Sequence, residues 1–388
     1  MKTTFWISLF LIFYTYLGYG IVLFFMIKIK RLFKGKPVLP NDNNLPTLSV
    51  VVAAYNEEDF IEEKIKNTLS LQYPAHKIQY IFVTDGSTDK TPEIVAHHAQ
   101  IKLLHSPERK GKIAAMHRTM KEISTEVVVF TDANTFLNKQ ALLNICRHYT
   151  DERVGAVSGE KRVHIEEVAD ATAGEGMYWK YESKLKTWDS ELYSVVGAAG
   201  ELFSIRTALY QPVPANAIID DFMISMLIAK KGYRIIYEPE AYASENASDN
   251  VKEELKRKIR IAAGGLQSII WLKDLLLPFK FPLLSFQYVS HRVLRWTITP
   301  FLMIIALILN FLIVINCPQI IYILILVAQT IFYGMALMGW YFESREVKVK
   351  LLFIPFYFCM MNWAVIAGIF RYLKGNQSVL WEKAKRKQ

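Results

Sequence analysis

Apolar residues follow two kinds of pattern along the chain. Long apolar runs occur towards both ends, whereas the middle alternates short apolar runs with segments whose apolar residues recur every three or four positions. A helix needs roughly 20 apolar residues to cross a bilayer core, so the long runs predict membrane-spanning helices. The alternation in the middle predicts strands and helices that right-handed crossovers join into a parallel sheet covered on both faces.

The first long apolar run, residues 5–27, contains no charged residue and is followed by a cluster of five basic residues between positions 28 and 36. A cleaved signal peptide has a shorter apolar region and a small-residue cleavage site. The run therefore predicts an uncleaved transmembrane anchor. The basic cluster predicts that the residues after it lie on the cytoplasmic side.

Three further apolar runs, 298–315, 320–341 and 351–370, are each near the length that spans a bilayer. Four crossings would leave both termini outside. The C-terminal tail nevertheless carries six basic residues, which the positive-inside rule places in the cytoplasm. Two alternatives stay open: the last run, interrupted by Pro355, re-enters without crossing, or the rule fails for this tail.

In the middle of the chain, short apolar runs predict strands at 48–54, 78–83, 101–104 and 127–130. Two of these strands run into an aspartate. Residues 78–83 lead to Asp85, and residues 127–130 lead to Asp132. The carboxyl ends of parallel strands meet at the edge where α/β sheets bind ligands, so we expect these carboxylates to lie together. With the basic turn that ends at Lys112, they suit a nucleotide diphosphate and a divalent metal.

The same motifs also have purely structural explanations. Short polar side chains commonly begin turns and cap helices, and acidic residues suit the positive N-terminal end of a helix. Under this alternative the side chains serve only as caps: Thr135 or Asn138 after the turn at Asp132, Asn56 before the first helix of the sheet domain, and the Asp220-Asp221 pair before the helix at 222–231.

Composition and charge narrow the class of protein. The 388 residues are 52% hydrophobic with a net charge of +10, and the mean hydropathy is +0.17. Part of such a chain should lie in a membrane, and its basic residues cluster beside the apolar runs. We expect no nucleic-acid partner, because no zinc-finger or RNA-binding signature is present. No Walker loop or GxGxxG motif occurs, and the three cysteines lack metal-ligand spacing.

Five short motifs, in this order and spacing, resemble the family-2 inverting glycosyltransferases of GT-A fold. The motifs are Ala54-Tyr55-Asn56-Glu57, the Thr-Asp-Gly-Ser turn at Asp85, Lys110-Gly111-Lys112, Thr-Asp-Ala-Asn at Asp132, and Ile219-Asp220-Asp221-Phe222 with the segment that follows it. The resemblance is closest to the membrane-bound branch that includes cellulose, hyaluronan and poly-N-acetylglucosamine synthases. It implies an α/β fold in which a mostly parallel sheet is flanked by N- and C-terminal transmembrane helices.

The resemblance also implies roles for individual residues. Asp221 matches the general base that acts on the acceptor hydroxyl, and a neighbouring like charge can raise the pKa of such a base. A divalent metal, Mg or Mn, is the implied cofactor. The remaining implied roles are nucleotide-sugar binding by Ala54, Tyr55, Glu57, Asp85, Lys112 and Asp132; metal binding by Asp132 and Asn134; and acceptor or diphosphate contacts by Asp220, Arg257 and Arg260.

Two motifs depart from the family pattern. The metal motif is often Asp-x-Asp, but here its last position is Asn134, whose amide oxygen carries no charge. Processive members carry Gln-x-x-Arg-Trp some forty residues after the base. Here the corresponding segment has Arg257 in place of Gln and Ile261 in place of the stacking Trp. The loss of the stacking Trp favours a single transfer over processive synthesis, whereas Asn134 bears on metal affinity.

The patterns and the resemblance together predict six segments. The segment 251–261 has an apolar face surrounded by basic residues, which suits an anionic membrane surface or, with comparable weight, packing on the sheet. The six segments are a transmembrane anchor (1–28), a basic and polar linker (29–46), the GT-A domain (47–250), amphipathic interface helices (251–296), transmembrane helices (297–372) and a basic tail (373–388).

The leading functional hypothesis is an integral protein of the cell (inner) membrane with a cytoplasmic catalytic domain. It would transfer a sugar, with inversion, from a nucleotide-sugar donor, expected to be a UDP-sugar, to a lipid-linked or cell-envelope glycan acceptor, and it would contact membrane lipids. One alternative is a processive exopolysaccharide synthase. Another is a non-catalytic nucleotide-binding scaffold. A transporter is disfavoured, because the membrane segments contain almost no ionisable residues.

Overall fold

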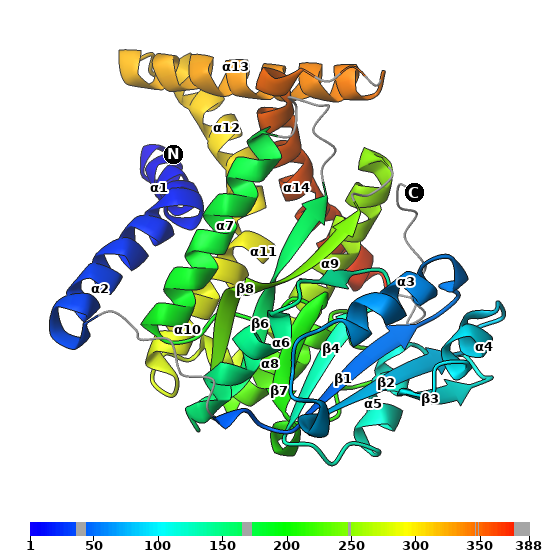
Figure 1. The fold of residues 1–388 in the computed structure, drawn as a ribbon. Coiled ribbons are helices and arrows are strands. Elements are labelled where there is room, and N and C mark those ends of the chain that lie inside the picture. The colour runs from blue at the N-terminus through cyan, green and yellow to red at the C-terminus, as the bar shows by residue number, and fades with distance from the viewer. Residues whose placement is uncertain (36–43, 165–172, 247–249, 346, 348, 376–388) are drawn as a thin grey trace. The chain divides into compact units, whose positions relative to one another are not determined.

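The predicted alternation of strands and helices forms the parallel half of one eight-stranded sheet (Figure 1). Its strands are β1 (Leu48–Ala54), β2 (Ile78–Asp85), β3 (Ile101–Ser106) and β4 (Val127–Asp132), and they pair in the order β3-β2-β1-β4. This computed structural model describes residues 1–35, 44–164, 173–246, 250–345, 347 and 349–375. Residues 36–43 of the predicted linker and the basic tail beyond residue 375 therefore lie outside the described residues.

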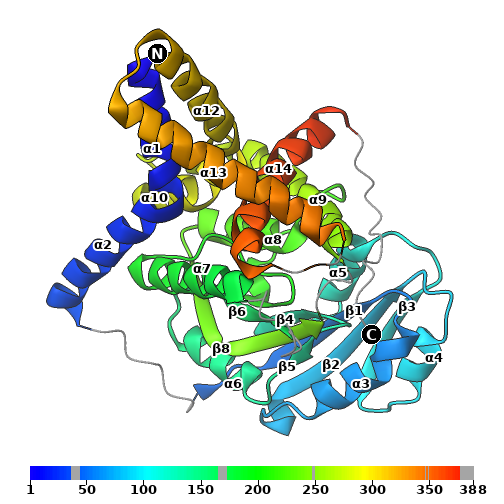
Figure 2. The same cartoon turned by 90° about the horizontal axis from the view of Figure 1, so that it is seen from above.

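The parallel strands are buried because helices cover both of their faces. Val50, Val51 and Val52 in β1 are each at most 1% exposed, as expected for a strand in the middle of a parallel sheet. The helices α3 (Glu58–Leu69) and α4 (Thr91–Ala96) lie on one side, and α5 (Lys112–Met120) lies on the other (Figure 2). The strand order reverses between β1 and β4, and α/β sheets bind ligands at such a switch point.

The other four strands were not predicted. Beyond β4 the sheet continues with β7 (Leu202–Arg206), β6 (Val154–His164), β8 (Arg234–Asn246) and β5 (Phe136–Leu137). Four of the seven neighbouring strand pairs are parallel, so the expected mostly parallel α/β sheet is confirmed for the described residues. The helices α6 (Ala141–Cys146), α7 (Ala173–Leu192) and α8 (Asp220–Lys230) complete this part of the chain order.

All three capping explanations are wrong. Helix α6, which follows Thr135 and Asn138, has Gln140 at its N-cap position with no side-chain cap. Helix α3 has Glu57 at its N-cap position with no side-chain cap. Asn56 instead adopts a φ of 52°, which asparagine tolerates, and its Oδ1 accepts from the Thr88 backbone N–H at 2.8 Å. At α8 the N-cap is Ile219, so Asp220 and Asp221 lie inside the first helical turn. Neither acid therefore caps the helix, although their place in the first turn still suits its positive N-terminal end.

The chain divides into two units. One holds the sheet and comprises residues 29–164 and 186–247; the other holds the helices of 1–28, 165–185 and 248–377. Within the described residues, four helical stretches are long and apolar enough to cross a membrane, as expected of a membrane protein. They are Lys2–Lys34 (α1, Lys2–Phe13; a π-helical turn, Tyr14–Gly18; α2, Tyr19–Lys34), α12 (Thr299–Asn316), α13 (Ile320–Glu343) and α14 (Lys350–Leu373).

The predicted amphipathic helix is α9 (Val251–Trp271), and its apolar face packs against protein. Val251 and Leu255 contact a cluster of α14 that contains Phe356 and Met360. Further along, a Cβ added at Gly368 of α14 would lie 2.7 Å from the Cβ of Ala262 in α9. Membrane-surface binding by α9 therefore stays a prediction. The helices α10 (Pro282–Tyr288) and α11 (Leu294–Trp296) follow in the same unit.

Candidate active site

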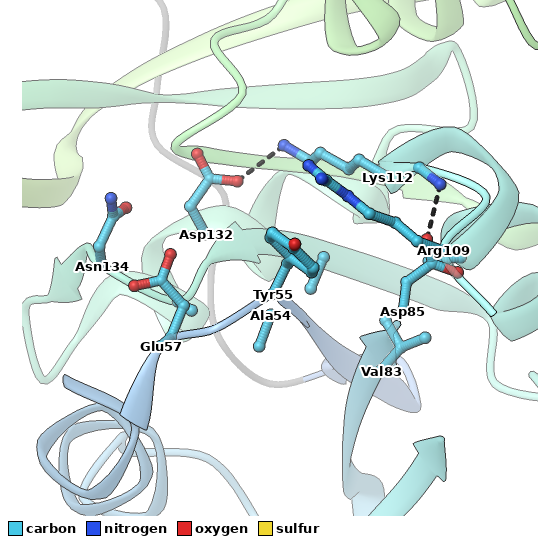
Figure 3. A pocket seen from close by; sticks show the side chains of 13 residues that line it. Ala54, Tyr55, Glu57, Val83, Asp85, Arg109, Lys112, Asp132 and Asn134 are labelled. Carbon is cyan, nitrogen blue, oxygen red and sulfur yellow. Dashed lines mark hydrogen bonds and ion pairs between the residues drawn. The ribbon is translucent and has the colours of Figure 1, made fainter. Parts of the chain in front are cut away.

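A pocket lies at the carboxyl ends of β1, β2 and β4, beside the switch point (Figure 3). It contains all six residues expected to bind the nucleotide sugar, together with the second expected metal ligand. Their roles stay predictions, but the structure brings the side chains together. The residues with polar side chains that line the pocket are Tyr55, Glu57, Asp85, Arg109, Lys112, Asp132 and Asn134, and Ala54 lies among them.

Lys112 and Asp132 form an ion pair across this pocket (Figure 3). The Lys112 Nζ lies 2.7 Å from Asp132 Oδ1, and the two side chains are 20% and 14% exposed. Burial acts to lower the pKa of Lys112, but Asp132, Asp220 and Asp221 together raise it above its usual value. Lys112 is thus held as a cation close to three carboxylates.

Asp85 holds the basic loop in place. Its Oδ2 accepts from the backbone N–H groups of Lys110 at 2.8 Å and Gly111 at 2.6 Å. Its Oδ1 lies 3.6 Å from an Nη of Arg118. Three groups from the segment after β3 therefore converge on one carboxylate at the end of β2. This positioning role was not predicted, and contact with the nucleotide stays a prediction for Asp85.

Arg109 is a pocket residue that the sequence analysis missed. Its guanidinium lies 3.8 Å from the centre of the Tyr55 ring, in cation–π contact. The sequence did hold a signal for Arg109, because it directly precedes Lys110-Gly111-Lys112. It adds a third basic residue to the two in that motif. The stack places a cation over the Tyr55 ring inside the pocket (Figure 3).

The two acids of α8 lie close enough to Lys112 to affect its pKa. Asp221 lies against Gly200, where an added Cβ would be 3.0 Å from Asp221 Oδ2. Burial, and then repulsion from Asp220, raises the pKa of Asp221 to about 7, although Lys112 opposes the rise. A carboxylate with a pKa near the working pH is suited to general base catalysis.

A second set of polar atoms surrounds Asp220, and sequence reasoning did not find it. Among the described residues, His117 Nε2, Tyr210 Oη and Asp220 Oδ2 are buried and have no hydrogen-bond partner. The rings of His117 and Tyr210 meet edge to face at 5.9 Å. Buried polar atoms are normally hydrogen-bonded, so these three atoms beside the acids of α8 could receive polar groups of a ligand.

The donor set at Asp132 and Asn134 fits a hard divalent cation. Asn134 Oδ1 is buried without a hydrogen-bond partner among the described residues, and Asp132 supplies a carboxylate in the same pocket. No group of three or more His, Cys, Asp or Glu side chains in the described part of the chain could hold a metal. Mg²⁺ and similar ions commonly take one or two protein ligands and complete their shell with phosphate and water.

The two other predicted residues, Arg257 and Arg260, lie on α9 in the other unit. Arg257 donates from Nε to Glu254 at 3.1 Å. Contact of either arginine with an acceptor or a diphosphate stays a prediction.

Comparisons with known proteins identify the sheet domain. Residues 49–212 match the family described as Glycosyl transferase family 2. The chain is 25% identical over 291 residues to a poly-β-1,6-N-acetyl-D-glucosamine synthase of Staphylococcus aureus, covering 71% of this chain and 68% of that protein. It is 26% identical over 247 residues to the probable glycosyltransferase YdaM of Bacillus subtilis, covering 58% and 56%.

A solved structure supports the same fold. The mannosyltransferase PcManGT from Pyrobaculum calidifontis, solved with GDP-Man and Mn²⁺, superposes with a TM-score of 0.71 at 24% identity, covering 96% of this chain and all of that one. At this identity the likeness shows the fold alone. With the family match and the relatives, it shows that this chain carries a family-2 glycosyltransferase domain of GT-A fold.

Proposed function

We propose that the chain transfers a hexosyl group from a nucleotide-sugar donor to a hydroxyl of a lipid-linked or cell-envelope glycan, with inversion at the anomeric carbon. One observation carries the proposal: Lys112 pairs with Asp132 while its charge also couples to Asp220 and Asp221. A cation suited to a leaving diphosphate and an acid suited to deprotonate an acceptor thus belong to one site.

In this mechanism the acceptor hydroxyl attacks the anomeric carbon as the bond from that carbon to the diphosphate oxygen breaks. Asp221 takes the hydroxyl proton, for which a pKa near 7 is suited. Lys112 and Arg109 lie on the pocket wall and meet the negative charge that the leaving diphosphate keeps. Attack from the side opposite the diphosphate inverts the configuration in a single displacement.

Asp132 and Asn134 would hold the divalent metal. Such a metal, when bound, neutralises charge on the diphosphate oxygens. Because Asn134 carries no charge, Asp132 is the single anionic protein ligand in this proposal, and Lys112 already pairs with its Oδ1. The identity of the metal follows from activity measured with Mg²⁺ and with Mn²⁺ in parallel.

For the donor we propose a UDP-sugar. The curated relative is named for a polymer of N-acetylglucosamine, and the fold relative was solved with GDP-Man. A screen of purified full-length protein against UDP- and GDP-sugars, read by thermal shift and by nucleotide release, tests this choice. Turnover of GDP-sugars alone would overturn it.

For the product we propose a single transfer. Ile261 stands where processive relatives have a stacking Trp, so an aromatic platform for a growing chain is missing from the motif. Product size after incubation with labelled donor decides between one added sugar and a polymer. A polymer would favour the alternative of a processive exopolysaccharide synthase. Nucleotide binding without hydrolysis or transfer would favour the non-catalytic scaffold, which Asn134 alone supports.

A further inference from the structure

A buried lysine lies beneath the loop that carries both proposed metal ligands. Lys64 belongs to α3, and its side chain is 0% exposed. Removing a charged group from water is costly unless the charge is hydrogen-bonded or paired. Burial lowers the pKa of Lys64 to about 7, although the negative charge of Asp132 opposes the shift. A lysine at such a position needs a structural or functional reason.

The contacts of Lys64 supply that reason. Its Nζ donates to Thr131 Oγ1 at 3.1 Å and to the backbone carbonyl of Thr135 at 2.6 Å. These two residues directly flank Asp132-Ala133-Asn134. The amino group of Lys64 therefore fixes both ends of the short segment between them.

The ends of the segment are tied further. Thr131 Oγ1 donates to the carbonyl of Glu201, at the edge of β7, at 3.0 Å. Thr135 Oγ1 donates to the carbonyl of Asp132 at 3.0 Å. On the pocket side, the Asp132 carboxylate pairs with Lys112. The segment is thus held by one lysine from the protein interior and faces another across the pocket.

We propose that Lys64 is a positioning residue for the metal and diphosphate site, fixing the 131–135 segment so that Asp132 and Asn134 present their oxygens to one cation. The inference rests on the proposed function. Metal ligands must be held within about 0.5 Å of their productive geometry. Residues that support metal ligands typically change metal affinity 10- to 100-fold when they are mutated.

The same helix offers a matched control. Asn67, three residues after Lys64, donates from Nδ2 to the Leu137 carbonyl and accepts from the Leu137 N–H, both at 2.9 Å. Like Lys64, it ties α3 to the chain after β4. Unlike Lys64, it acts beyond the segment that carries the two proposed ligands. Loss of either residue should destabilise the fold, but only loss of Lys64 should disturb the metal site.

The test measures Mn²⁺ affinity and thermal unfolding of the full-length protein in lipid nanodiscs, with UDP and with GDP present. We expect Lys64→Met to raise the Kd for Mn²⁺ at least about tenfold. Asn67→Leu should lower the unfolding temperature and leave the Kd within about twofold of wild type. An unchanged Kd in Lys64→Met, or equal weakening in both variants, would overturn the inference.

A milder variant keeps the test decisive if Lys64→Met does not fold. Thr131→Val preserves the shape of the side chain and removes one acceptor of Lys64. It should weaken Mn²⁺ binding severalfold, and wild-type affinity in this variant would overturn the inference. Failure of the proposed function has a different signature: wild-type protein would bind no Mn²⁺ with either nucleotide, or Asp132→Ala would bind it as tightly as wild type.

Discussion

Asp132 is the single charged residue of the proposed metal motif, and its carboxylate already pairs with Lys112 at 2.7 Å. We therefore expect Asp132→Ala to abolish transfer and to weaken donor binding, measured by turnover and by nucleotide-sugar affinity. Asn134→Asp restores the more common charge pattern and should keep activity while it tightens metal binding. Retained activity in Asp132→Ala would contradict the role of Asp132 as a metal ligand.

If Asp221 is the general base, its loss should slow sugar transfer without weakening donor binding. A lost base matters only as the acceptor attacks, so Asp221→Asn should bind nucleotide sugar nearly as wild type does. Its transfer rate should fall by roughly a hundredfold or more, the range that general base catalysis supplies. Asp220→Asn should lose less. If Asp220→Asn were instead the inactive variant, Asp220 and not Asp221 would be the general base.

The raised pKa of Asp221 predicts the direction of the pH dependence. The base must be deprotonated, so kcat/KM should fall as the pH drops below about 7, the value to which burial and Asp220 raise this pKa. Glu201 acts in the same direction as Asp220, and Lys112 opposes both. Asp220→Asn removes a raising charge, so the midpoint should move to lower pH. If the midpoint of the pH profile did not move in Asp220→Asn, Asp220 would not be a cause of the raised pKa of Asp221.

The acids of the pocket could be predicted from the sequence, but the role of Lys64 could not. The pocket acids were predictable because each follows an apolar run, and the sheet order then brings those strand ends together. Lys64 was missed although it lies between Ile61 and Ile65 on the buried face of α3, where a charge is unexpected. Its partners Thr131 and Thr135 are distant in sequence. Only the packing of α3 against the end of β4 reveals them.

At the scale of elements, the apolar runs predicted β1 to β4 because strands buried on both faces need apolar residues throughout. β6 was missed for the opposite reason. Its second half, from Gly159 onward, is mostly polar and holds Lys161 in an ion pair with Glu201. Polar strands of this kind give no periodic signal, so the mixed half of the sheet, beyond β4, appears only in the structure.

The turn after β2 makes a testable prediction about the basic loop. Gly86 has a φ of +68°, and an added Cβ would lie 2.5 Å from the Cβ of Arg109. Gly86→Ala should therefore destabilise the fold by about 1–3 kcal/mol and also weaken donor binding by displacing the loop. Gly232→Ala is the control, because Gly232 has a φ of +94° with open space around it. The control should lose stability, measured by denaturant unfolding, with unchanged donor affinity.

At the scale of the whole molecule, the helical unit bears on the open question of topology. α14 packs along α9, from the cluster at Phe356 to the close contact at Gly368. The first half of α9 carries exposed ion pairs such as Lys256 with Glu253. Charged side chains avoid the bilayer core, so α9 should lie at the membrane surface and hold α14 there. We therefore expect α14 not to cross, which leaves the basic tail in the cytoplasm.

Cysteine labelling of intact cells tests this topology. Lys2 Nζ lies 3.6 Å from Cys317 Sγ in the α12–α13 connection, so the N-terminus and that connection share one end of the unit. With a cytoplasmic sheet domain, both should face outside. Cys317 is exposed and should react with a membrane-impermeant maleimide, whereas Cys317→Ser is the blank. A new cysteine from Lys385→Cys, in the Cys317→Ser background, should react only after permeabilisation, because the tail stays inside. Labelling of that tail cysteine in intact cells would show that α14 crosses and that the positive-inside rule fails here.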